Sequence, residues 1–288
     1  MHNEQKLSML ALSLIFPPAS SIFHKMYSYF GNAAEMLDNI IKDKNTNLPD
    51  FLKQRINSFD IGYAEDIYNY CENNGIHTVT LECNEYPARL KEIDCPPAVL
   101  YFRGNLSALN VSKSVAVVGA RKACDYSVKI ADAFSKSLAE NNTAIISGFA
   151  NGIDTAAHRA CLSADGITVA VLGCGIEYDY PKGKSELKKL ISQKGAVISE
   201  YPPLTRPAPD NFRIRNRIIA GLSKAILVVQ AGRKSGSLNT VSHGLEQGKD
   251  IYVIPPRDIF SADFAGQTLL LKDGAQAAYS PHDIMINI

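Results

Sequence analysis

Six short apolar runs recur between residues 114 and 255, and a more polar stretch of 19 or more residues separates each run from the next. The runs are continuous in Val, Ile, Ala and Leu, which is typical of strands buried on both faces of a sheet. The stretches between them carry the periodicity of helices. This alternation predicts an α/β fold with a doubly wound, mostly parallel, Rossmann-like sheet. The predicted strands are residues 114–119, 143–147, 167–173, 195–199, 225–230 and 250–255, and the clearest helices between them are Tyr126–Glu140, Asp154–Leu162 and Ser237–Gln247.

The N-terminal part of the chain lacks this alternation. Residues 1–82 predict a small helical domain, and residues 83–110 predict a lead-in segment to a core that occupies residues 111–288. The lead-in contains three prolines and one candidate strand, the run AVLYF. The helices expected in the N-terminal domain are Gln5–Phe16, Ser20–Phe30, Ala33–Lys42 and Ala64–Asn73.

An early apolar run and the cysteines indicate a cytoplasmic protein without membrane contact. The run Leu7–Phe16 is too short to cross a bilayer, and serines interrupt it. The six cysteines are widely spaced, with no CxxC pair and no Cys/His cluster, so we expect reduced thiols and no metal site. Cys174, which stands between two glycines, is interpreted as a small buried side chain rather than a reactive thiol.

The net charge of +1 conceals an uneven distribution. Residues 1–110 hold 9 basic and 13 acidic side chains, whereas residues 111–288 hold 21 basic and 16 acidic ones. The segment from Arg206 to Lys234 contains seven basic residues and only Asp210 as an acid. A phosphate-bearing partner is therefore favoured for the predicted α/β core, although a charged cluster can also be merely solvated.

The turns that follow the predicted strands are rich in Gly, Ser and Arg. In an open parallel sheet, ligands bind beyond the carboxyl ends of the strands, so these turns meet at the expected binding edge. Each can direct backbone N–H groups or a guanidinium toward an anion. Five such turns at one edge predict a groove rather than a single pocket. They read GARKACDYS, SGFANGID, GCGIEYDYP, SEYPPLTRPAPDNF and AGRKSGSLNT.

The common nucleotide and catalytic motifs are absent. Gly173-Cys174-Gly175 lacks the third glycine of GxGxxG, and Tyr178 stands where a P-loop needs its first glycine. No GxSxG or HExxH motif occurs, so we expect no cofactor and no enzymatic activity. His158, four residues after Asp154, is one candidate base, but such a histidine more often packs and forms structural hydrogen bonds.

The stretch FRIRNRIIAGLS, residues 212–223, places three arginines at the start of an apolar helical pattern. If the helix begins near Arg213, Arg215 falls within the apolar face, while Arg213 and Arg217 lie at its border. At least one guanidinium is then partly buried and needs an anionic partner. Either a carboxylate of the same chain or a bound phosphate can supply it. Further on, Ser235-Gly236-Ser237 is compatible with a phosphate clamp and equally with a plain serine N-cap.

Taken together, these segments resemble the DNA-processing protein A family, also called DprA/Smf. The resemblance extends from about Tyr86 to Ala275 and includes YPARL, VAVVGAR, IISGFANGIDTAAH, VAVLGCGIEYDYP, FRIRNRIIAGLS and SGSLNT in the order of the family. It implies a Rossmann-like core that binds single-stranded DNA, forms homodimers and passes incoming DNA to the RecA recombinase during natural transformation. The DNA- or phosphate-binding residues that it implies here are Gly119, Arg121, Ser147, Gly148, Gly152, Phe212, Arg213, Arg215, Asn216, Arg217, Lys234, Ser235, Gly236 and Ser237.

Phe212 is expected to offer a ring on which a base can stack. The sequence departs from the family pattern at Pro209, where a lysine is common, so Arg206 or Arg213 would have to replace that charge. Two alternatives remain open: a sensor of a small nucleotide, and an enzyme similar to nucleoside-monophosphate phosphoribohydrolases. The second is disfavoured because those enzymes carry a glutamate where this chain has His243.

Overall fold

The computed structural model describes residues 2–42 and 48–288, and within them it contains one nine-stranded sheet of order β1-β2-β6-β5-β4-β3-β7-β8-β9. The six predicted strands are confirmed and all run parallel to their neighbours in the series from β6 to β8. They are β3 (Ser114–Gly119), β4 (Ala144–Ser147), β5 (Thr168–Leu172), β6 (Ala196–Ser199), β7 (Ala225–Gln230) and β8 (Asp250–Val253).

The chain winds outward from β3 in two directions. Strands β4, β5 and β6 follow on one side of β3, and the chain then crosses the sheet so that β7 pairs with the other side. The carboxyl ends of β3 and β7 therefore lie at the point where the strand order reverses, which is where open α/β sheets bind ligands.

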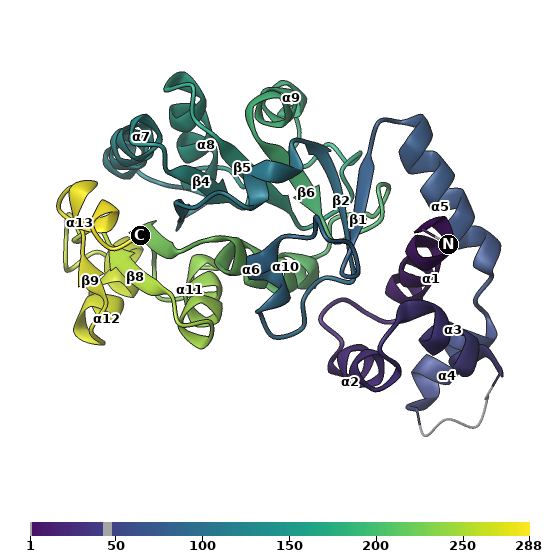
Figure 1. Cartoon of the computed structure of the whole chain (residues 1–288). Coiled ribbons are helices and arrows are strands. Elements are labelled where there is room, and N and C mark those ends of the chain that lie inside the picture. Colours follow the sequence, from purple (N-terminus) through teal and green to yellow (C-terminus); the bar gives the residue numbers. More distant parts are fainter. Residues whose placement is uncertain (1, 43–47) are drawn as a thin grey trace.

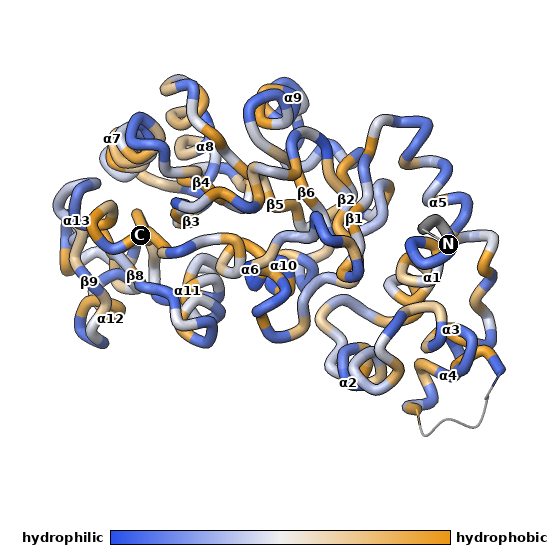
Figure 2. The backbone as a smooth tube through the Cα atoms, viewed as in Figure 1, coloured by the Kyte–Doolittle hydropathy of each residue, from blue (hydrophilic) through white to orange (hydrophobic). Residues whose placement is uncertain are grey.

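Helices cover both faces of this sheet (Figure 1). One face carries α7 (Asp125–Glu140), α8 (Ile153–Ser163) and α9 (Ser185–Lys194); the other carries α6 (Ala88–Lys91), α10 (Pro209–Leu222), α11 (Ser237–Glu246) and α12 (Ala265–Lys272). Alternate side chains of β3 enter the two cores: Val115 and Val117 pack toward α7 and α8, and Ala116 and Val118 pack toward α10. Figure 2 shows hydrophobic residues concentrated along the strands, whereas the helices contain both hydrophobic and hydrophilic residues.

The sheet extends beyond the six predicted strands at both edges. The lead-in forms β2 (Val99–Gly104), which pairs antiparallel with β6, and β1 (His77–Thr80) pairs antiparallel with β2. At the other edge, β9 (Gln276–Ala277) pairs parallel with β8, and α13 (His282–Met285) follows it. The candidate strand AVLYF of the lead-in is confirmed as part of β2, whose Leu100 and Tyr101 are fully buried, whereas β1 was not expected.

The N-terminal part is helical as predicted. It comprises α1 (His2–Ile15), α2 (Ser21–Phe30), α3 (Ala33–Lys42), α4 (Asp50–Asn57) and α5 (Ile61–Asn73), of which α4 was not expected. Met9 and Leu12 of α1 share one buried cluster with Val99 and Tyr101 of β2, so the helices pack directly against the sheet edge. That residues 1–82 form a folding unit of their own stays a prediction. Within the described ranges, no helix has the length and apolar character needed to cross a membrane.

Candidate nucleic-acid interface

A groove of about 850 Å³ opens at the carboxyl edge of the sheet, at the reversal point between β3 and β7. Its wall is built from the turn after β3, the first two turns of α10 and the turn between β7 and α11. The sequence-predicted residues that line it are Gly119, Arg121, Phe212, Arg213, Arg215, Asn216, Lys234, Ser235, Gly236 and Ser237. The topology thus brings together at one site most of the residues that the sequence singled out.

Two glycines allow the turn after β3 to lie against the start of α8. A Cβ on Gly119 would stand 2.6 Å from the Ile153 side chain, and a Cβ on Gly152 would overlap the backbone carbonyl of Ala120. Gly152 also has a φ of +77°, which L side chains rarely adopt. Gly152 is not among the residues that line the groove; the structure gives it a structural role, because it shapes the turn that carries Arg121, and its phosphate contact stays a prediction.

Five cations line the groove without an ion pair or hydrogen bond within the described part of the chain: Arg121, Lys122, Arg213, Arg233 and Lys234. The carboxylates among the lining residues are Asp154, which is buried, and Asp263. Because uncompensated cations outnumber the carboxylates in a concave site, the groove has a positive field that attracts anions.

Phe212 lies at the centre of a cluster of rings and guanidinium groups. The guanidinium carbons of Arg121 and Arg215 lie 5.4 and 5.7 Å from its ring centroid, and the Tyr180 ring centroid lies at 5.3 Å. The edge of the Phe212 ring also fits against Gly173, where a Cβ would approach it to 2.5 Å. The first glycine of GCG therefore accommodates an aromatic ring, and a base that stacks on Phe212 must compete with the groups already there.

Arg215 is buried at 4% exposure and spans from α10 to the ends of two strands. Its guanidinium donates hydrogen bonds to the carbonyls of Gly148 (2.8 Å) and Val171. Burial lowers the pKa of Arg215 to about 10, while the nearby Asp154 carboxylate opposes that shift, so Arg215 remains charged at neutral pH. Arg215 thus borders the groove and fixes the position of α10.

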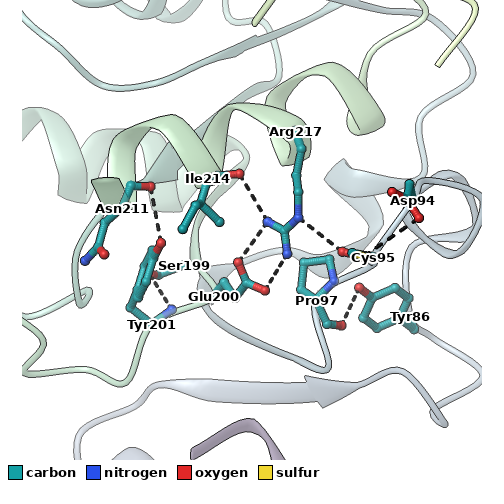
Figure 3. A network of polar contacts seen from close by, with 10 residues as sticks. All are labelled: Tyr86, Asp94, Cys95, Pro97, Ser199, Glu200, Tyr201, Asn211, Ile214 and Arg217. Atoms are coloured by element: carbon teal, nitrogen blue, oxygen red, sulfur yellow. Dashed lines mark hydrogen bonds and ion pairs between the residues drawn. The ribbon is translucent and has the colours of Figure 1, made fainter. Parts of the chain in front are cut away.

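The prediction that Arg217 contacts phosphate is wrong. Its guanidinium is 4% exposed, lies outside the groove and pairs with both carboxylate oxygens of Glu200 at 2.9 and 2.5 Å (Figure 3). It also donates to the Cys95 carbonyl at 3.1 Å. The sequence left open whether a carboxylate of the same chain or a bound phosphate would pair with a buried arginine here. For Arg217 the partner is the Glu200 carboxylate. Glu200 also raises the pKa of Arg217, because its charge outweighs the effect of burial.

The helix begins one turn earlier than expected, with Pro209 at its first position. A proline is well suited there because the first N–H of a helix has no partner within the helix. The start places Arg213 on the exposed side and lining the groove, whereas Arg206 is exposed but does not line it. Of the two arginines that could replace the usual lysine charge, only Arg213 is in position.

Three other predicted residues have structural partners. Ser147 is fully buried and donates to the Val117 carbonyl at 2.6 Å, so its predicted role as a phosphate ligand is corrected. Gly148 borders a second cavity of about 380 Å³ beyond Arg121 and Phe212 rather than the main groove. Asn216 lines the main groove but donates to the Asn239 side chain at 3.0 Å, which ties α10 to α11.

The Ser235-Gly236-Ser237 segment lies at the N-terminus of α11. Gly236 occupies the cap position, but the Ser235 hydroxyl accepts a hydrogen bond from the Ser237 N–H at 3.4 Å, much as a serine cap would. The hydroxyl groups of Ser235 and Ser237 also contact each other at 2.8 Å. Both serines line the groove at the N-terminus of α11, where the helix dipole favours an anion.

His158 and Asp154 do not form a catalytic pair. His158 is fully buried, and its Nδ1 lies 2.7 Å from the Thr168 hydroxyl, which itself donates to the Ile145 carbonyl. Nδ1 therefore carries the proton, and burial lowers the pKa of His158 to about 3. Asp154 accepts a hydrogen bond from the Ala150 N–H, and burial raises its pKa. The structural interpretation of His158 is confirmed by these contacts.

Cys174 is 1% exposed, and burial raises the pKa of its thiol, which agrees with its interpretation as a packed side chain. Among the groove residues that were not singled out in the sequence are Lys122, Tyr180, Gln230 and Arg233. Lys122 and Arg233 are adjacent in sequence to the predicted residues Arg121 and Lys234, so their position in the same turns could have identified them as groove residues. Tyr180 reaches Phe212 through a long loop after β5, for which no local pattern exists.

The family comparison agrees with this geometry. Residues 77–288 match the family model described as DNA recombination-mediator protein A. The chain is 35% identical over 233 residues to the DNA processing protein DprA of Bacillus subtilis, covering 81% of this chain and 78% of that protein. It is 40% identical over 200 residues to the DprA of Streptococcus pneumoniae, covering 69% and 70%.

Two solved structures of DprA proteins are similar to this chain. The X-ray structure of DprA from Streptococcus pneumoniae superposes with a TM-score of 0.84 at 32% identity, covering 96% of both chains. DprA from Helicobacter pylori, whose structure describes a single-stranded DNA binding mode, superposes with a TM-score of 0.66 at 29% identity, covering 73% of this chain and 94% of that one. The chain belongs to the DNA recombination-mediator protein A family.

Proposed function

We propose that this protein binds single-stranded DNA in the groove, largely without regard to base sequence. The observation that carries the proposal is the set of five cations without ion pairs that line the same groove as Phe212, one of which, Arg121, lies over its ring. Cations that track phosphates, combined with rings on which bases stack, are the usual means of binding a single strand without sequence preference. The Helicobacter pylori relative, whose structure concerns single-stranded DNA binding, supports the same ligand.

A single strand fits this site better than a duplex. The rings of Phe212 and Tyr180 lie within the groove lining, where an unpaired base can reach them but a base inside a duplex stack cannot. Cations from different turns, such as Arg121 and Lys234, line the same groove and can pair with the phosphates of a strand that enters it.

In this proposal the protein is a non-enzymatic DNA-binding protein. The candidate base is buried and neutral, so no proton-transferring group faces the groove from that position. Following the family resemblance, we propose that the protein is a cytoplasmic homodimer that protects incoming DNA and helps to load the RecA recombinase during natural transformation. The family membership supports these assignments.

A small nucleotide is the second candidate ligand, because a groove of about 850 Å³ lies within the range of small-molecule sites. The enzyme alternative has less support: His243, at the position of the expected glutamate, is half-buried and contacts Glu246 on its own helix at 3.2 Å.

Thermal-shift measurements with mononucleotides and oligothymidine test the proposal. A ligand that binds the native state alone raises the Tm with the logarithm of its concentration. We expect the oligonucleotide to raise the Tm at concentrations where mononucleotides leave it unchanged. A shift caused only by a mononucleotide would support the sensor, and release of ribose from a nucleotide would support the enzyme.

A further inference from the structure

The loop between β8 and α12 forms one rim of the groove. At its start, the Arg257 guanidinium carbon lies 5.7 Å from the ring centroid of Tyr126, in the first turn of α7. At its end, Ala262 and Asp263 line the groove itself. The residues between these two anchors therefore stand beside the groove opening, near Lys122 in the turn that precedes α7.

The middle of this loop exposes two large apolar side chains. Ile259 is 62% exposed and Phe260 is 92% exposed, and the Phe260 ring has the highest exposed fraction among the large hydrophobic residues described. Hydrogen bonds hold the loop in shape: the Phe260 N–H donates to the Asp258 carboxylate at 2.9 Å, and the Asp263 N–H donates to the Ser261 hydroxyl at 3.3 Å. The exposed ring thus belongs to a structured loop, and nothing in the described chain covers it.

We propose that Phe260, in the loop that Arg257 anchors on Tyr126, is a second platform on which bases stack as a single strand leaves the groove. The inference rests on the proposed function and adds a specific outer contact to it. Tyr126 is 36% exposed, so both rings present accessible surface at the same rim.

Two observations favour a nucleic acid over a protein as the occupant. The platform is continuous with the groove, because the loop residues next in sequence line it. Cations are available along this path: Lys122 lines the groove and Arg257 contacts Tyr126 at the start of the loop, so phosphates next to a stacked base have possible partners. The nearest loop carboxylate, Asp258, is engaged by the backbone of its own loop.

The protein contains no tryptophan, so Phe260→Trp introduces a single fluorescent reporter at the platform. Stacking with a base quenches indole fluorescence. We expect quenching with an oligothymidine of about twenty nucleotides and none with one of about six, which fills only the groove. Anisotropy of labelled oligonucleotides records binding independently. Binding of the long strand without quenching would overturn the platform and leave the groove function intact, whereas absence of any binding would overturn both.

Phe260→Ala tests the energetic contribution. We expect its affinity for the long strand to fall about 5-fold or more, with unchanged affinity for the short one, because loss of one stacked base weakens only the outer contact. Tyr29→Ala is the matched control, since Tyr29 is 83% exposed on α2 in the helical N-terminal part. Equal affinities of Phe260→Ala and the parent at both lengths would overturn the proposal and indicate that the loop serves a protein partner.

Discussion

Arg217 and Glu200 form a bidentate ion pair beneath α10 (Figure 3). Each of two guanidinium nitrogens donates a hydrogen bond to a different oxygen of the carboxylate. The side chains are 5% and 8% exposed, so the pair is sealed from water. Arg213, one helical turn before Arg217, is exposed and lines the groove. Two arginines of one motif therefore have different environments: Arg217 is buried in an ion pair, and Arg213 is exposed in the groove.

Arg217→Ala is expected to destabilise the fold without altering the groove. Removing one partner leaves the Glu200 carboxylate buried and unpaired, which costs about 3–5 kcal/mol. Chemical denaturation measures the loss. Replacing both residues, as in Arg217→Met with Glu200→Leu, should recover much of the stability, because an apolar pair does not leave a buried charge. A single variant as stable as the parent protein would contradict the burial of this pair.

Arg213→Ala is expected to show the opposite behaviour. The free energy of unfolding should change by less than about 0.5 kcal/mol, because the side chain is exposed and unpaired. The affinity for oligothymidine should fall, and the slope of log K against log salt should become shallower by about 0.7 for one lost phosphate contact. Arg206→Ala is the control, since Arg206 is exposed outside the groove. If Arg206→Ala weakened binding more, the replacement of the family lysine would be assigned wrongly.

Acid should destabilise the protein through His158. Burial holds its folded pKa at about 3, against 6.5 for an exposed histidine, so the unfolded state takes up a proton first as the pH falls. This contribution to stability is complete above pH 6.5 and is lost as the pH falls toward 3, by about 1.4 kcal/mol per pH unit. Denaturation at several pH values, compared between the parent and His158→Gln, isolates it from the carboxylates. Identical slopes in the two proteins would contradict a neutral buried His158.

Two glycines share a φ of +77° and can be compared by substitution with alanine; Gly152 combines this φ with a ψ of −124°. A Cβ added at Gly183 would project into open space, so Gly183→Ala should cost only the strain of a left-handed residue, about 1–2 kcal/mol. Gly152→Ala should cost more and should also weaken DNA binding, because the Cβ collides with the turn that carries Arg121. Thermal unfolding and anisotropy measure both effects. Equal stability of the two variants would show that the turn after β3 can move to accommodate the added Cβ, which would contradict the prediction.

The sequence predicted the sheet well because strands buried on both faces must be continuously apolar, as in residues 114–119 and 225–230. It predicted the groove because the carboxyl ends of parallel strands meet at one edge. Helix α4 was missed because it is short and mostly polar, with Leu52 as its one buried residue.

The sequence alone could not predict which arginines of α10 are buried in structural contacts and which line the groove. Helix α10 is buried along its whole second half, from Arg215 to Leu222, so an amphipathic pattern could not assign one side to solvent. The Arg217 partners, Glu200 and the Cys95 carbonyl, stand 17 and 122 residues away in sequence, and only the fold brings them together. The same holds for Tyr180, whose ring joins Phe212 through tertiary packing alone.

The salt dependence of oligothymidine binding, measured by fluorescence anisotropy for the parent protein and Arg121→Ala, tests the central claim most directly. If the groove neutralises phosphates, log K falls linearly with log salt by about 0.7 for each phosphate contacted, and Arg121→Ala binds more weakly with a shallower slope. Affinity that is independent of salt, or an Arg121→Ala variant that matches the parent at every salt concentration, would contradict it.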